Sequence, residues 1–255
     1  MADSYAILAP IYSRVGLNAE SEWLRGRVFD RLQSEGWLGR RILELGCGIG
    51  ETACWFAANG FRVTAVDQSE AMLAQARHSA DSQGVSVDWR QEDILRFQPD
   101  SDFDLVLSMS TLNELHSIRD LEQVFQVANR ALSQDKLLFF DLVTIGGLAE
   151  QWGDSDKVLY DDPGALALVV RSRFSFETLA NTRAYLVYRH DGECWHREDE
   201  AHILRGYALQ AVGALLKRTG FNVQNVLNLN LETFDPNADR TGRAIFIAAK
   251  ERNLE

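Results

Sequence analysis

The most informative segment of this 255-residue chain is Ile42-Leu43-Glu44-Leu45-Gly46-Cys47-Gly48-Ile49-Gly50. An apolar run leads directly into glycines at alternate positions, as in a buried strand that ends in a tight loop. Glycine permits positive φ there and lets a ligand approach the backbone without a Cβ in the way. A helix predicted over residues 51–59 follows, and its first turn offers unpaired N–H groups with partial positive charge. The stretch therefore predicts a strand–loop–helix unit whose loop holds a phosphate or a carboxylate.

Strands and helices alternate around this loop as far as residue 143. The apolar patterns predict strands at 41–45, 61–66, 85–90, 103–108 and 136–143, and helices at 20–35, 51–59, 69–82 and 121–132. Such alternation is typical of right-handed crossovers and of a parallel sheet covered by helices on both faces. We therefore expect an α/β fold with a doubly wound sheet.

The pattern changes after residue 143. Three consecutive strands are predicted at 166–177, 182–190 and 194–202, and Asp191-Gly192 between the last two is a strong hairpin signal. A helix at 207–218 and strands at 221–231 and 243–249 then follow. We expect one domain formed by residues 1–143 and 204–255, with an antiparallel insertion at 144–203.

Composition excludes several classes of protein. The net charge of −11 argues against nucleic acid or an anionic membrane as the main partner, since both require a basic surface. No apolar run approaches the ~18 residues of a membrane span. Cys47, Cys54 and Cys194 form no CxxC pair and no ligand cluster with histidines, so we predict no metal site and a reducing, cytoplasmic location.

The glycine spacing distinguishes two kinds of ligand. A dinucleotide fingerprint requires GxGxxG, but Glu51 stands where its third glycine would be. Glu44, beside the loop, suits a ligand with an ammonium group better than a pyrophosphate. Asp67, at the end of the next strand, can accept from both hydroxyls of a ribose. Asp93, after the third strand, can accept from an adenine amino group.

These motifs, in order, resemble a known family. E-L-G-C-G-I-G, A-V-D-Q-S, E-D-I and F-D-L-V-L-S are similar to the motifs of class I S-adenosylmethionine-dependent methyltransferases. The resemblance implies a Rossmann-like, mostly parallel seven-stranded sheet with an antiparallel insertion after strand 5. It also implies S-adenosylmethionine as cofactor and S-adenosylhomocysteine as product. The implied cofactor-binding residues are Tyr12, Glu44, Gly46, Cys47, Gly48, Gly50, Asp67, Gln68, Asp93, Ile94 and Ser108.

The N-terminus adds a second resemblance. Tyr5-Ala6-Ile7-Leu8-Ala9-Pro10-Ile11-Tyr12 is similar to the opening of small-molecule methyltransferases, including the amino-sugar N-methyltransferases. This implies that residues 1–38 form a lid over the cofactor, that the insertion caps a small-molecule acceptor, and that Tyr5 and Tyr12 line the site or pack the lid. Ser133-Gln134-Asp135 replaces the Pro-Gly-Gly that is frequent in the family, which affects a turn. The sequence leaves open a monomer or a homodimer.

A sulfonium methyl is already activated, so we expect in-line transfer to O or N with alignment and exclusion of water as the protein's main tasks. A general base is required only if the acceptor arrives protonated. His116 is our first candidate, with a capping or surface role as the alternative, followed by His202 and Glu114. Asn113, Arg205 and Tyr5 are predicted to contact the acceptor. The alternative for His202 and Arg205 is a solvated position at the edge of the insertion. Asp141 ends the fifth strand, where it could face the acceptor.

Other interpretations remain open. An NAD(P)-dependent oxidoreductase is disfavoured by Glu44 and Glu51, and a non-catalytic S-adenosylmethionine-binding protein would keep the same pocket. Nucleic-acid methylation is weakened by the charge and by Ser108-Met109-Ser110-Thr111, where N6-adenine enzymes carry an Asn/Asp-Pro-Pro-aromatic motif. The run Arg197-Glu198-Asp199-Glu200 indicates a solvated patch. The aromatic residues of the insertion form its core or a pocket: Trp152, Tyr185, Tyr188 and Trp195.

Overall fold

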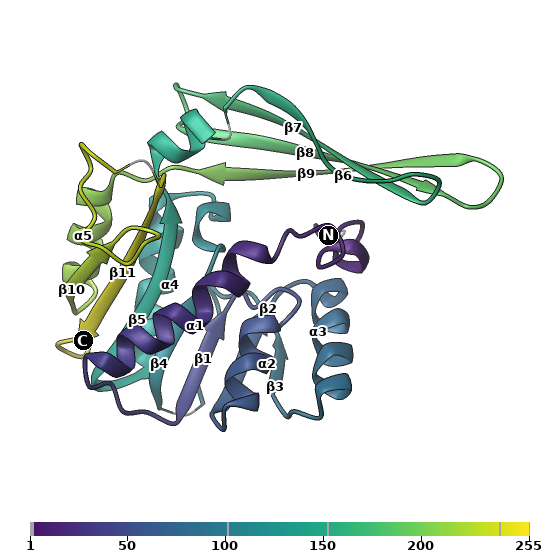
Figure 1. Cartoon of the computed structure of the whole chain (residues 1–255). Coiled ribbons are helices and arrows are strands. Elements are labelled where there is room, and N and C mark those ends of the chain that lie inside the picture. The colour runs from purple at the N-terminus through teal and green to yellow at the C-terminus, as the bar shows by residue number, and fades with distance from the viewer. Residues whose placement is uncertain (1–2, 101, 152, 240, 255) are drawn as a thin grey trace.

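Two sheets organise the protein in the computed structural model, which describes residues 3–100, 102–151, 153–239 and 241–254. The larger sheet has seven strands in the order β10–β11–β5–β4–β1–β2–β3 (Figure 1). They are β1 (Arg41–Leu45), β2 (Arg62–Asp67), β3 (Asp88–Gln91), β4 (Phe103–Ser108), β5 (Leu132–Val143), β10 (Phe221–Leu227) and β11 (Arg243–Lys250). β1 to β5 are parallel, and β11 runs antiparallel to its neighbours β5 and β10. The predicted mostly parallel, seven-stranded sheet is confirmed.

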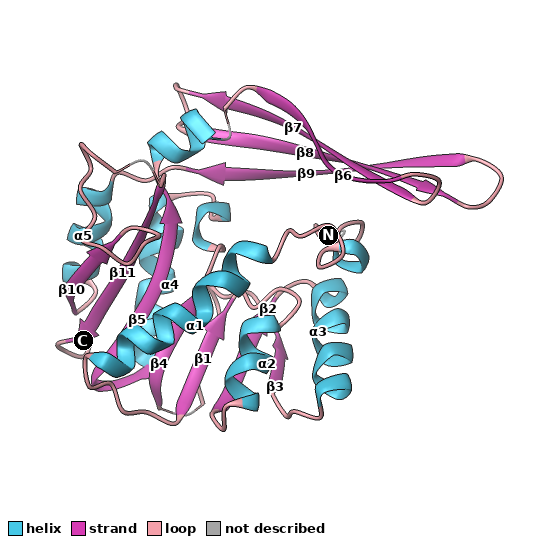
Figure 2. Cartoon of the chain, viewed as in Figure 1, coloured by secondary structure: helices cyan, strands magenta, loops and turns pink. Residues whose placement is uncertain are grey.

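Helices cover both faces of this sheet, as Figure 2 shows. They are α1 (Ala19–Ser34), α2 (Glu51–Ala58), α3 (Glu70–Gln83), α4 (Ile118–Ala131) and α5 (Leu209–Arg218). Because side chains alternate along a strand, Ile42 of β1 packs with α1 and α2 while Leu43 packs with α4 and α5. None of the helices described is long and apolar enough to cross a bilayer.

Helix starts follow local sequence signals. Ser69 accepts a hydrogen bond from Met72 N at 3.1 Å and begins α3, as predicted. Ser117 accepts from Asp120 N at 3.2 Å in the same way. This capping serine explains why α4 begins at Ile118, three residues before the predicted start.

The antiparallel insertion forms the second sheet, which we call the cap. It consists of β6 (Ser155–Asp162), β7 (Leu166–Ser175), β8 (Ala180–His190) and β9 (Trp195–Arg205), in that order. The cap lies above the carboxyl ends of the parallel strands (Figure 1). The sequence predicted three of these strands and missed β6, whose side chains are mostly exposed and show no apolar alternation.

The N-terminal segment, residues 3–17, lies between the two sheets. Leu8, Ile11 and Val15 are buried against apolar residues of the cap, including Leu168 and Val170. The 3₁₀ helix η1 (Ala9–Ile11) also contacts α3. Within the lid expected at residues 1–38, this segment therefore contacts the cap, whereas α1 packs on the large sheet.

Candidate active site

The glycine loop, Gly46–Gly50, joins β1 to α2 in a left-handed backbone conformation. The φ angles of Gly46, Gly48 and Gly50 are 75°, 52° and 74°. A Cβ on Gly46 would lie 2.3 Å from Thr111 Cγ2, and one on Gly50 would lie 2.5 Å from the Trp89 ring. A Cβ on Gly48 would meet no atom within 4 Å. Packing therefore requires two of the glycines, while the third leaves open space above the backbone.

Two carboxylates lie at this loop, those of the buried Glu44 and the half-buried Asp67. Glu44 is 3% exposed, and its Oε2 has no hydrogen-bond partner among the described residues. Burial, reinforced by the nearby Asp67, raises the pKa of Glu44 to about 8. Asp67 accepts from Gly48 N at 2.8 Å and from Ser69 N at 2.9 Å, although burial still raises its pKa. An unpaired buried carboxylate is costly, so a cationic group above the loop would stabilise both charges.

The other residues predicted to bind the cofactor lie at the same edge of the sheet. Gln68 follows β2 and is exposed, and Ile94 is half-buried against the core. Asp93 accepts from Leu95 N at 2.9 Å in the turn after β3. Ser108 is 1% exposed and donates to Leu45 O at 2.9 Å, so its hydroxyl ties β4 to β1. The Cys47 thiol is buried, and burial raises its pKa, as expected for a small packing residue.

A cavity of about 350 Å³ lies between this edge and the cap. Tyr5 and Tyr12 of the N-terminal segment, Glu114 after β4, and Tyr185 and His202 of the cap all line it. Both tyrosines also pack against the cap.

His202 is the centre of a connected polar network in this cavity. It is 7% exposed, and its Nε2 lies 2.7 Å from Glu200 Oε1 while its Nδ1 lies 4.0 Å from Glu114 Oε2. The Tyr5 hydroxyl donates to Glu114, and the Tyr5 ring centroid lies 4.3 Å from that of His202. An imidazole oriented by a carboxylate in a cavity can take up a proton.

The cavity and the glycine loop are adjacent, because Tyr5 and Tyr12, which line the cavity, pack in one cluster with Ile49 of the loop. The pKa values of Tyr12 and Glu114 are raised mainly by burial, and the charge of Asp67 raises each of them further. Both cavity residues therefore lie within electrostatic reach of the carboxylate that anchors the loop.

Comparison with known proteins shows which protein family this chain resembles. Residues 42–135 match a protein family described as a methyltransferase domain. The chain contains a methyltransferase domain. A protein of Geobacillus sp. (strain WCH70) named "Putative methyltransferase" is 28% identical over 250 residues, which cover 97% of this chain and 100% of that protein. The predicted methyltransferase family is confirmed.

Solved structures share the fold. An S-adenosylmethionine-dependent methyltransferase from Clostridium acetobutylicum aligns with a TM-score of 0.80 at 21% identity, covering 90% of this chain and 91% of that one. CalS10 from Micromonospora echinaspora, an amino pentose methyltransferase with S-adenosylmethionine bound, aligns with a TM-score of 0.66 at 19% identity, covering 89% of each.

Of three further residues predicted for the acceptor site, two lie outside the cavity and the third lines it. His116, the first candidate base, is exposed and does not line the cavity. Arg205 also lies outside the lining and donates to Thr178 O at 3.1 Å. Asn113 lines the cavity, but its amide hydrogens go to Val143 O at 3.0 Å and Arg205 O at 2.8 Å.

Asp141 is enclosed rather than turned toward an acceptor. Its carboxylate pairs with Arg243 and accepts from Ser110 N at 2.8 Å. Arg243 in turn pairs with Glu20 and lines the cavity. No sequence motif marks this ion-pair network, because its members come from α1, β5 and β11.

The sequence also missed Glu200. The run that contains it was interpreted as a solvated patch, which is wrong for Glu200 because its side chain is 8% exposed and bonded to His202. Of the aromatic residues of the cap, Tyr185 lines the cavity while Trp195 is 47% exposed. Trp152 lies outside the described residues.

Proposed function

We propose that this methyltransferase transfers a methyl group from S-adenosylmethionine to an oxygen or nitrogen of a small-molecule acceptor bound beneath the cap. The observation that carries the proposal is the position of the cavity, between the carboxyl edge of the parallel sheet and the cap. Open α/β sheets bind their ligands at this edge. The amino pentose substrate class in the name of CalS10 supports a small acceptor.

The chain's own residues fit the cofactor. The glycine loop, Cys47 included, and Glu44 would hold its methionine part, with the unpaired Glu44 oxygen suited to a cation. Asp67 and Gln68 would hold the ribose, and Asp93 and Ile94 the adenine. Ser108 and Tyr12 complete the site, Ser108 by fixing the strand ends and Tyr12 by covering the loop. When bound, S-adenosylmethionine supplies a methyl group on a positively charged sulfur, already activated for displacement.

The polar network of the cavity would supply proton transfer. His202 accepts the proton of the acceptor's attacking atom, and Glu200 fixes the orientation of the ring. Glu114, held by the Tyr5 hydroxyl, places a carboxyl group on the other side of the ring. The N-terminal segment and the cap enclose the reacting atoms and exclude water.

Cofactor binding and acceptor binding are assigned to different parts of the chain. Residues 1–143 and 204–255 form the cofactor-binding domain, and residues 144–203 form the substrate cap. Cys47, Cys54 and Cys194 are free thiols, which supports a cytoplasmic location.

Calorimetry with S-adenosylhomocysteine tests the cofactor site, with Gly48→Ala and Gly60→Ala as matched variants. Both glycines have positive φ, 52° and 86°, and neither added Cβ meets an atom within 4 Å. Each substitution costs about 1–2 kcal/mol of backbone strain. Only Gly48→Ala should weaken binding, because its methyl group enters the space above the loop. Equal affinity of both variants, or binding of a nicotinamide dinucleotide instead, would overturn the proposal.

Turnover tests the second half of the proposal. Production of S-adenosylhomocysteine is measured with a panel of small amines and alcohols, amino sugars among them. Cofactor binding without turnover on any member would favour the non-catalytic alternative.

A further inference from the structure

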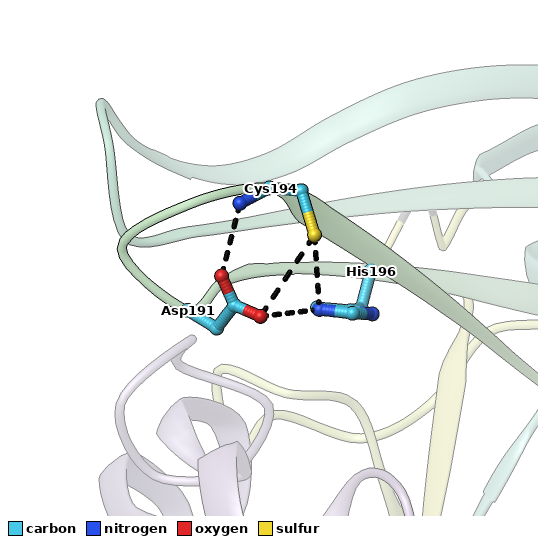
Figure 3. Close-up of side chains that lie close together, drawn as sticks. All are labelled: Asp191, Cys194 and His196. Atoms are coloured by element: carbon cyan, nitrogen blue, oxygen red, sulfur yellow. Dashed lines mark hydrogen bonds and ion pairs between the residues drawn. The ribbon is translucent and has the colours of Figure 1, made fainter.

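The turn between β8 and β9 brings three metal-ligand atoms together at the end of the cap (Figure 3). His196 Nε2 lies 2.6 Å from Asp191 Oδ2 and 3.3 Å from Cys194 Sγ, and Cys194 Sγ lies 3.8 Å from Asp191 Oδ2. The expectation that the cysteines form no cluster with histidine is therefore wrong for Cys194. We propose that Asp191, Cys194 and His196 form a Zn²⁺ site.

The donor set and its dimensions fit this ion. Zn²⁺ binds cysteine sulfur, histidine nitrogen and carboxylate oxygen in tetrahedral geometry. Its usual bond lengths place neighbouring donors about 3.4–3.6 Å apart. The three observed separations bracket this range, so a small widening between Asp191 and His196 admits the ion.

The turn orients its ligands before any ion binds. Asp191 Oδ1 accepts from the N–H groups of Glu193 and Cys194, each at 2.9 Å. These bonds leave Oδ2 directed at the site, as Figure 3 shows. The strand register continues to the pair His190↔Trp195, with Arg189↔His196 before it, so the backbone of the turn is fixed. Bonds that orient a ligand in this way increase metal affinity.

The site is independent of the methyl-transfer proposal. None of the three residues lines the cavity, and the turn lies at the far end of the cap from the large sheet (Figure 1). All three side chains are exposed, so three protein ligands leave the fourth tetrahedral position to water.

Metal titration of the full chain, stripped with chelator and kept reduced, tests the site. We expect one Zn²⁺ per chain in competition with a chromophoric chelator, and a thiolate-to-cobalt charge-transfer band when Co²⁺ replaces it. Cys194→Ser and His196→Ala should each weaken binding by more than roughly tenfold, since ligands matter more than their supporting bonds. The affinity for Zn²⁺ should decrease as the pH is lowered, because a metal ion binds only the deprotonated thiol and imidazole.

The matched control is His78→Ala, which removes an exposed histidine of α3. This variant should bind Zn²⁺ as the native chain does. Unchanged affinity in Cys194→Ser, a cobalt band that survives that substitution, or no binding to the native chain would each overturn the proposal. Circular dichroism verifies that every variant is folded, and methyl transfer should be unaffected in all of them.

Discussion

The two walls of the candidate active site hold their polar groups in different ways. At the edge of the large sheet, side chains bond to backbone: Asp67 accepts from Gly48 N at 2.8 Å, and Thr111 donates to Gly46 O at 3.0 Å. Around His202, beneath the cap, polar side chains contact one another. His202 lies 2.7 Å from Glu200, and the Tyr5 hydroxyl donates to Glu114.

This difference indicates how strongly substitutions can alter each wall. Backbone groups are present whatever the side chains are, so the loop geometry is fixed once its glycines and anchors are in place. A network of side chains can be altered by single substitutions that leave the backbone as it is. We infer that the sheet edge determines the donor, while the cavity network determines the acceptor and its proton transfer.

The largest effect is expected in the cavity network. His202→Gln should lower kcat by about 10²–10⁴, the usual contribution of a general base, because glutamine cannot take up a proton. Affinity for S-adenosylhomocysteine should stay unchanged, since the glycine loop is untouched. Steady-state kinetics and calorimetry measure the two quantities.

His116→Gln is the control for this prediction. It removes the histidine that the sequence favoured, which is exposed and outside the cavity, so turnover should equal that of the native protein. Full activity of His202→Gln, or an equal loss in His116→Gln, would refute the role of His202.

The two walls also differ in how far sequence reasoning could describe them. The predicted bounds of β1 and β4 agree with the structure, and the glycine loop, Glu44 and Asp67 lie together as expected. Their signals are local, because strand, loop and helix follow one another in the chain. The polar network of the cavity is not local: Tyr5 and Glu114 are 109 positions apart in sequence, and only the fold brings them to His202. Apolar periodicity also failed to predict β6, because most of its side chains are exposed. It failed again at Glu200, because this charged side chain is buried.

A smaller effect is expected at the sheet edge, where Asp67→Ala is compared with Asp104→Ala. Asp104 accepts from Arg40 N at 2.8 Å and Arg41 N at 3.0 Å at the amino end of β4, so it also anchors backbone. Asp67→Ala should weaken S-adenosylhomocysteine binding by about 1.5–3 kcal/mol, the scale of hydrogen bonds to a charged group. Asp104→Ala should leave the affinity measured by calorimetry unchanged. Equal losses would mean that Asp67 acts only through stability.

The smallest effect concerns Glu44, whose pKa in the folded protein is raised to about 8 from an ordinary value of 4.5. Without ligand, the folded chain keeps a proton that the unfolded chain releases, so this stability is complete below pH 4.5 and is lost as pH rises toward 8. Between pH 6 and 7, the free energy of unfolding should therefore fall by about 1.4 kcal/mol more in the native protein than in Glu44→Gln. Urea unfolding measures it, and Glu177→Gln, in the exposed turn after β7, should follow the native protein. If Glu44→Gln followed the native protein as well, the carboxylate would already be ionised and compensated, and the loop would hold no unpaired carboxylate for a cationic ligand to stabilise.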